Sequence, residues 1–195
     1  PDELAPHEVR GLIGELWLLA QVSRVKGVAN ALSSWVAPDD HPQDFAFSTE
    51  IVEVKTRLAG SKPHVSISSL EQLEVGHLPF HLLVVELSPS EAETSLGLND
   101  MAARLIREAA ALGVDVEEQA QLALRKRSYA ITPPYDDLRY VVSGIRAFAV
   151  EEGFPRIIRS AVDRRVQQAT YVLDLTGLGT FEKDPIGLIS TIQGS

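Results

Sequence analysis

Residues 51–58 constrain the fold most strongly, because their side chains alternate in character. Mostly apolar residues occupy every second position, and Glu53, Lys55 and Arg57 fall between them. Successive side chains of a β-strand point to opposite faces, so the pattern predicts a strand with one face packed in a core. Glu53 and Lys55 then project from the same face, while Val54 packs on the other.

The flanking sequence predicts helices and strands in a mixed order. A helix over residues 7–22 is apolar almost all round, and Glu15 is its only charge between Gly11 and Ala20. Further helices are expected near residues 25–34, 99–112 and 115–127, with a short one after Ser68. Further strands are expected over residues 44–48, 64–67, 81–87, 139–150 and 171–175.

This element order favours the α/β class, with a central mixed sheet of about four to five strands flanked by helices. The length of 195 residues suits a single domain. We expect its core to span about residues 7–90 and a C-terminal helical and strand extension to span about residues 95–195. Because the sequence begins at Pro1 rather than Met, we also expect it to be a fragment of a longer protein.

Composition excludes several classes of function. The chain has no cysteine, which rules out disulfide scaffolds, thiolate zinc sites and cysteine nucleophiles. Its apolar runs, such as residues 82–85, are far too short to cross a bilayer. We therefore expect a cytoplasmic protein with no membrane partner. A formal net charge of −9 means that any contact with DNA must come from a local basic patch.

Carboxylates near the 51–58 strand suggest metal chemistry. If residues 44–48 pair with that strand as a hairpin, Asp44 lies beside Glu53, and the helix of Glu15 offers a third carboxylate. Hard cations such as Mg²⁺ or Mn²⁺ prefer oxygen ligands of this kind. A divalent cation neutralises phosphoryl oxygens and activates water, while Lys55 stabilises developing negative charge.

A simpler interpretation competes with this one. A Glu-x-Lys triplet is common, and alone it is typical of a same-face ion pair on a solvated strand. The conjunction with Asp44 and Glu15 favours the catalytic interpretation. Glu50 is expected to be a solvated residue of the turn between the two strands.

The combination of motifs resembles the PD-(D/E)XK nuclease superfamily, which has the restriction-endonuclease-like fold. More closely, it resembles a family of uncharacterised bacterial proteins assigned to that superfamily. At the proline of the "PD" motif this chain has Gln43, with Pro42 one step earlier. The residues that carry the resemblance are Gly11–Leu16, Asp44–Phe45, Glu53–Thr56, Ser66–Leu73 and Glu152–Arg156.

The resemblance implies a restriction-endonuclease-like core with metal ligands at Asp44 and Glu53, a catalytic lysine at Lys55 and an accessory acid at Glu15. We include Glu15 and the backbone carbonyl of Val54 among the expected ligands of Mg²⁺ or Mn²⁺. Gln72 is a possible accessory residue that holds a metal-bound water or the DNA backbone. A capping or solvated glutamine is the alternative for Gln72.

Two functions follow as hypotheses. The first is a Mg²⁺-dependent DNA endonuclease of bacterial restriction or phage defence, with DNA as partner and with a homodimer and other defence proteins as possible partners. The second is a catalytically inactive restriction-like module that binds DNA or protein in a larger assembly. Candidate DNA contacts are Arg57, Arg125, Lys126 and Arg127, although the last three also suit the end of a helix, whose dipole favours cations.

Overall fold

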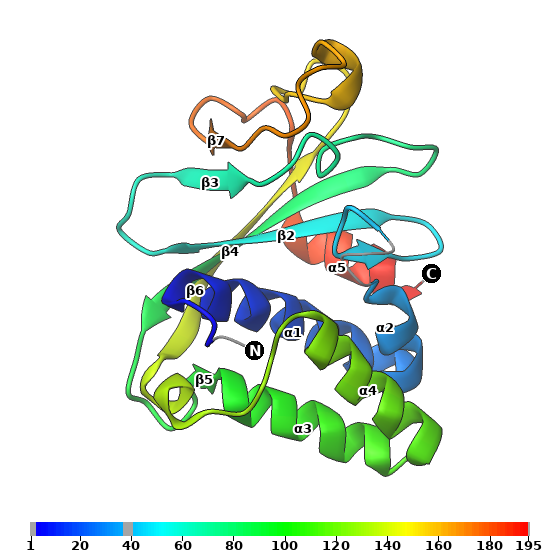
Figure 1. The fold of residues 1–195 in the computed structure, drawn as a ribbon, viewed down its shortest axis with the longest axis vertical. Helices are drawn as coiled ribbons and strands as arrows, with labels where there is room; N and C mark the ends of the chain where they lie inside the picture. The colour runs from blue at the N-terminus through cyan, green and yellow to red at the C-terminus, as the bar shows by residue number, and fades with distance from the viewer. Residues whose placement is uncertain (1–2, 37–40, 195) are drawn as a thin grey trace.

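A mixed β-sheet forms the centre of the molecule (Figure 1). The computed structural model describes residues 3–36 and 41–194. The main sheet has six strands in the order β1-β2-β4-β6-β5, with β8 paired to β6. Only β2 and β4 run parallel, and the other pairs are antiparallel. The strands are β1 (Phe45–Ala46), β2 (Ile51–Leu58), β4 (Phe80–Pro89), β5 (Leu96–Gly97), β6 (Arg139–Ala149) and β8 (Glu182–Lys183).

The central strand β4 confirms the prediction from its apolar run. It pairs with β2 on one edge and with β6 on the other. Its side chains enter two separate cores: Leu82 and Val84 pack on one face of the sheet, and Leu83 and Val85 on the other. A strand covered on both faces needs apolar residues at successive positions.

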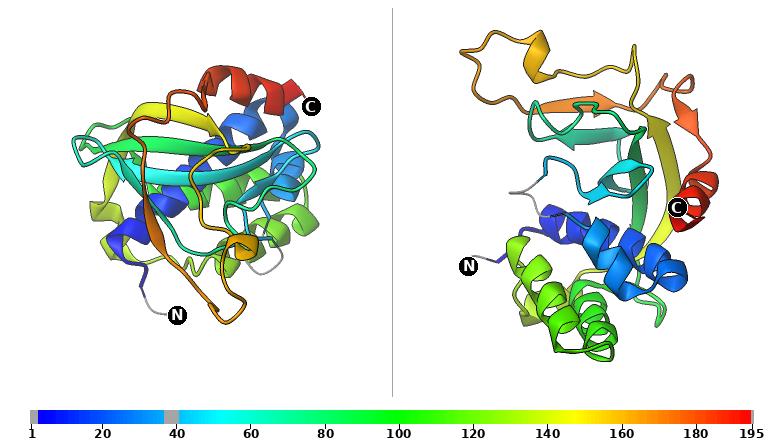
Figure 2. Two further views of the ribbon diagram at one scale, coloured as in Figure 1. Left: turned by 90° about the horizontal axis from the view of Figure 1, so that it is seen from above. Right: turned by 90° about the vertical axis from the view of Figure 1, so that its right-hand side faces the viewer.

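Helices cover one face of this sheet, and a second small sheet covers the other (Figures 1 and 2). The helices are α1 (Pro6–Lys26), α2 (Val28–Ser34), α3 (Leu98–Ala110), α4 (Val114–Lys126) and α5 (Pro185–Gly194). The small sheet pairs β3 (His64–Ile67) with β7 (Tyr171–Asp174) in antiparallel register. Two short 3₁₀ helices, η1 (Pro133–Asp137) and η2 (Arg159–Ala161), lie in the connections. The α/β class and the mixed sheet agree with the sequence analysis.

Two expected elements differ. Residues 44–48 contribute only the two-residue strand β1, and Asp44 lies in the bend before it. The helix expected after Ser68 is wrong, because residues 69–73 form bends and turns. In the part of the chain that the structure describes, no helix has the length and apolar character that crossing a bilayer requires.

Close packing between α1 and β2 sets the position of the helix. A Cβ added at Gly14 would lie 2.4 Å from Thr56 Cγ2 and 3.4 Å from Val54 Cγ1. The absence of a side chain at Gly14 therefore lets the helix approach the strand. Gly11, in the same helix, has no such role, since a Cβ at Gly11 would meet no heavy atom within 4 Å.

Gly14→Ala should lower the free energy of unfolding by about 1–3 kcal/mol, because Thr56 is β-branched and its methyl group has little freedom to move. Gly11→Ala, in the same helix, should instead raise it by about 0.5–1 kcal/mol through helix propensity. Urea unfolding measures both. Adding Thr56→Ser to Gly14→Ala removes the clashing methyl and should recover stability, and failure to recover would contradict this account.

Candidate active site at the open edge of β2

A polar cleft lies along the edge of β2 that β1 leaves uncovered. β1 pairs only with Ile51 and Val52, and no further strand of the described chain pairs with this edge. The cleft has a volume of about 500 Å³ and lies between α1 and β3. Its lining includes every residue predicted to be catalytic or accessory: Glu15, Asp44, Glu53, Lys55 and Gln72.

Asp44 and Glu53 are held side by side by the start of the β1–β2 hairpin. The backbone N–H of Val54 donates a hydrogen bond of 2.8 Å to Asp44 Oδ2, which fixes this carboxylate against the strand. Glu53 is only 1% exposed. Its Oε1 pairs with Lys55 Nζ at 2.9 Å, and its buried Oε2 has no hydrogen-bond partner among the described residues.

Burial of these groups shifts their pKa values. The pKa of Asp44 lies well above its ordinary value, because burial disfavours the charge and because Glu53 and Glu15 repel it. Burial raises the pKa of Glu53 to about 6, although Lys55 opposes the shift. Burial alone would lower the pKa of Lys55, but Glu53, Asp44 and Glu15 raise it above its ordinary value. Lys55 is therefore cationic at neutral pH.

Gln72 points toward the lysine. Its Oε1 accepts hydrogen bonds from Lys55 Nζ at 3.2 Å and from the backbone N–H of Ser68 at 2.7 Å. The carbonyl oxygen of Gln72 thus helps to position the ammonium group, which also pairs with Glu53. Of the two expected alternatives, a solvated glutamine does not describe these contacts, whereas the hydrogen bond from the Ser68 N–H agrees with a capping glutamine.

Gln43 anchors the turn that carries Gln72, a role that the sequence analysis missed. Its side chain is buried, and Nε2 lies within hydrogen-bond distance of three backbone carbonyls, those of Glu71, Gln72 and Glu74, at 3.1, 3.1 and 3.3 Å. The residue that replaces the motif proline therefore ties the Asp44 bend to the Gln72 turn. Its adjacency to Asp44 was the only signal in the sequence.

Glu15 reaches the cleft from α1 and is held by two donors. Its Oε2 accepts from Trp35 Nε1 at 2.7 Å and from Arg127 Nε at 2.6 Å. The Arg127 guanidinium also lies 3.7 Å from the centre of the Trp35 ring and donates to the Val36 carbonyl. Because the Arg127 side chain is only 5% exposed, this placement corrects its assignment as a DNA contact: it positions Glu15.

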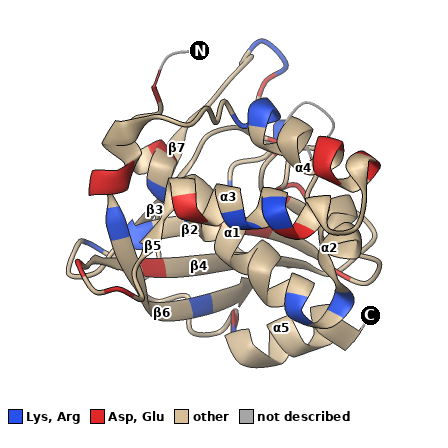
Figure 3. Cartoon of the chain, turned by 90° about the horizontal axis from the view of Figure 1, so that it is seen from below, with Lys and Arg blue, Asp and Glu red and all other residues tan. Residues whose placement is uncertain are grey.

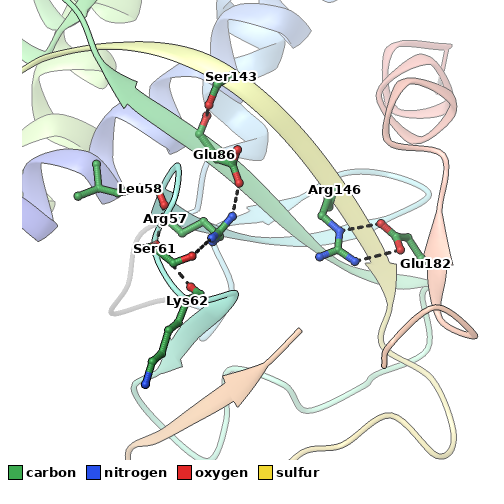
Figure 4. A network of polar contacts seen from close by, with 8 residues as sticks. All are labelled: Arg57, Leu58, Ser61, Lys62, Glu86, Ser143, Arg146 and Glu182. Atoms are coloured by element: carbon green, nitrogen blue, oxygen red, sulfur yellow. Dashed lines mark hydrogen bonds and ion pairs between the residues drawn. The ribbon is translucent and has the colours of Figure 1, made fainter. Parts of the chain in front are cut away.

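The other candidate DNA contacts lie in different surroundings. Arg57 lines the cleft, but it pairs with Glu86 and donates to the Ser61 carbonyl, as Figure 4 shows beside the Arg146–Glu182 pair. Arg125 and Lys126 are exposed at the end of α4 and do not line the cleft. On that helical side, basic and acidic positions are interspersed (Figure 3).

Glu50 is not the solvated turn residue that the sequence suggested. It is 9% exposed, and its Oε2 lies 3.0 Å from Nδ1 of His81. The expectation was wrong because β4 brings His81 beside the hairpin turn, a contact between residues 31 positions apart in the chain. Glu50 does not line the cleft.

The donors present fit a hexacoordinate hard cation that keeps most of its water. Within residues 3–36 and 41–194, no group of three or more His, Cys, Asp and Glu side chains is arranged to hold a metal ion. Mg²⁺, however, is commonly held by one or two carboxylates and several waters. Asp44 and the unpartnered Glu53 Oε2 supply two carboxylates. The Val54 carbonyl faces the same edge, because the N–H and C=O of one residue point the same way across a strand.

Comparison with known families agrees with this geometry. A family model described as "Putative PD-(D/E)XK family member, (DUF4420)" matches residues 1–176. The chain belongs to this family. The DUF4420 match spans α1, the whole cleft and both sheets through β7, so the resemblance drawn from the motifs is confirmed. No curated protein and no solved structure matches the chain.

In this DUF4420 chain, the buried carboxyl groups should make stability depend on pH. A carboxyl whose pKa is higher in the folded state holds more protons there, so stability falls as pH rises. The metal-free protein should therefore lose on the order of 1–2 kcal/mol between about pH 4 and pH 7, since the pKa of Glu53 rises from 4.5 to about 6. Thermal unfolding in EDTA across this range measures the loss.

Asp44→Asn supplies the control for that measurement. The amide keeps an oxygen for the Val54 N–H but carries no charge, so at pH 7 in EDTA the variant should be more stable than wild type. Mg²⁺ or Mn²⁺ should raise the unfolding temperature of wild type and not of Asp44→Asn. A variant less stable than wild type at pH 7 would contradict the buried-charge account.

Removing Arg127 should destabilise the protein, because the Glu15 charge loses its ion-pair partner. Arg127→Met leaves that carboxylate with Trp35 as its remaining donor, and the free energy of unfolding should fall by on the order of 3 kcal/mol. Adding Glu15→Gln should recover part of this loss, because the uncompensated charge disappears. Arg125→Gln, two residues away and exposed, should change stability little. A strictly additive double variant would argue against the pair.

Proposed function

We propose that the chain is a metal-dependent phosphodiesterase whose substrate is DNA, acting as an endonuclease in bacterial restriction or phage defence. The observation that carries the proposal is the carboxylate pair of buried Glu53 and half-buried Asp44 beside the cationic Lys55 at one open strand edge. Two adjacent carboxylates that repel each other are costly alone. A divalent cation held by Asp44 and Glu53 would remove that cost, and membership of the PD-(D/E)XK family supports this use of the site.

Each residue then has a distinct role. Asp44, Glu53 and the Val54 carbonyl would hold Mg²⁺ or Mn²⁺. The bound ion supplies charge neutralisation at the phosphoryl oxygens and lowers the pKa of water. Lys55, kept charged by Glu53 and aimed by Gln72, stabilises the negative charge that develops on the phosphoryl group.

Glu15 acts further from the scissile phosphate than Asp44 and Glu53 do. Arg127 and Trp35 both bind its Oε2, so Oε1 is left for a water or for the outer coordination of the cation. We retain Glu15 as the accessory acid on this basis. A homodimer would place two such sites on a duplex, and dimerisation and other defence proteins as partners stay predictions.

The second candidate is an inactive restriction-like module that binds DNA or protein. The observation in its favour is that Glu15 pairs with Arg127, which leaves only Asp44 and Glu53 as carboxylate ligands. In the described chain, no group of three or more His, Cys, Asp and Glu side chains is arranged to hold a metal ion. Against it stands the intact set of Asp44, Glu53 and Lys55, which a module without catalysis has no need to keep buried.

Cleavage of supercoiled plasmid distinguishes the two functions. Wild type should convert the plasmid to nicked or linear forms with Mg²⁺ or Mn²⁺ and leave it intact in EDTA. Lys55→Met should lower the cleavage rate by roughly 100-fold or more, the scale of losing one group that stabilises the transition state. Its metal affinity, measured by calorimetry, should be equal or higher, because a positive charge next to the ion is gone.

Asp44→Asn is the matched variant, since it should lose metal binding and cleavage together. If Lys55→Met cleaves like wild type, the lysine is only an ion-pair partner of Glu53. If wild type neither binds a divalent cation nor cleaves, the binding module is the better description.

A further inference from the structure

The cleft continues beyond the carboxylates along the first turns of α1. His7, Arg10 and Gly11 lie on the same side of the helix as Glu15 and line the same cleft. The rise of 1.5 Å per residue places Arg10 about 7 Å from Glu15 along the helix axis. Nothing in the metal site uses these three residues.

Arg10 differs from the other cations of the cleft in its charge balance. The lysine and arginine side chains that line the cleft are Arg10, Lys55 and Arg57. Lys55 pairs with Glu53 and Arg57 pairs with Glu86. Arg10 is half-buried and has no ion-pair or hydrogen-bond partner among residues 3–36 and 41–194. Its guanidinium is thus the strong cation of the cleft whose charge no carboxylate of the described chain offsets.

Gly11 adds a steric observation. It lines the cleft, and a Cβ built there would meet no heavy atom within 4 Å. The helix backbone is therefore open to the cleft directly beside Arg10, so that an extended ligand can approach it closely. A free guanidinium beside bare backbone suits a phosphate, which arginine binds through two parallel hydrogen bonds.

We propose that Arg10, with the open surface at Gly11 and His7, forms a track for the nucleic-acid backbone that leads into the metal site. This inference rests on the proposed function and names how that site takes its substrate. Because Arg10 and the proposed metal ligands line one cleft, Arg10 binds a backbone phosphate near the one that is cleaved. The contact is to the backbone, so it carries no sequence information.

The test compares Arg10→Gln with Arg24→Gln. Arg24 is an exposed arginine of the same helix, outside the cleft, so the control removes the same charge elsewhere. Binding of a short fluorescent duplex DNA is followed by anisotropy with Ca²⁺, over a series of salt concentrations. Arg10→Gln should weaken binding about tenfold. It should also reduce the slope of log K against log salt by about 1, equally for two unrelated sequences.

Cleavage kinetics add a readout that a structural role would not move. Arg10→Gln should raise KM while kcat stays near the wild-type value, because the contact is made equally in the ground state and the transition state. Gly11→Gln, which places a side chain in the open track, should fold normally and also raise KM.

The outcomes separate the two proposals. If wild type cleaves and binds DNA but Arg10→Gln matches Arg24→Gln in affinity and salt slope, the track is overturned and the nuclease proposal stands. If Arg10→Gln lowers kcat with KM unchanged, Arg10 is not a backbone anchor. If Gly11→Gln folds and has wild-type KM, the substrate does not pass over α1. If wild type neither binds nor cleaves DNA, the proposed function fails first.

Discussion

Two adjacent carboxyl groups place the strongest physical demand on this structure. Glu53 is buried and Asp44 is half-buried at the edge of β2, and Glu53 raises the cost of charging Asp44. The hydrogen bond from the Val54 N–H and the ion pair to Lys55 offset part of that cost. Glu53 Oε2 has no hydrogen-bond partner among the residues that the structure describes. Repulsion between the two carboxylates destabilises the folded state, and a bound divalent cation would relieve this repulsion.

The surrounding residues hold this arrangement from three directions. Gly14 brings α1 against Val54 and Thr56 on the rear of the strand. Gln43 ties the bend of Asp44 to the turn of Gln72. From the far end of α4, Arg127 reaches Glu15 and stacks on Trp35. Helices, turn and strand are therefore coupled through the cleft, and a catalytic constellation needs this rigidity to keep its geometry.

Positive charge is unevenly balanced along the cleft. The net charge of −9 leaves little general attraction for a polyanion. Within the cleft, Lys55 and Arg57 have carboxylate partners, whereas Arg10 at the N-terminal part of α1 has none in the described chain. In the proposed nuclease, a polyanionic substrate would be drawn to this end of the cleft, where helix backbone is open at Gly11. The position of one cation would then matter more to binding than the net charge of the chain.

The sequence by itself determined the longer helices and strands around the cleft and the central acid–acid–lysine set. Alternation over residues 51–58 gave the strand that carries Glu53 and Lys55 on one face, and the apolar run after His81 gave the central strand. Both signals are local, since side-chain direction in a strand follows from sequence position alone. The hairpin that brings Asp44 to Glu53 spans few residues, so this contact could also be predicted from the sequence.

Tertiary structure alone decided which charges far apart in the chain are paired. Arg127 is 112 residues from Glu15, Glu86 is 29 residues from Arg57, and β4 places His81 against Glu50. Sequence spacing carries no information on such contacts, because they depend on how helices and strands pack after they form. The same packing buried Arg127 and left Arg10 without a partner in the described chain. Whether a cation is available to a substrate is thus a property of the assembled fold, since it depends on the nearest carboxylate in space.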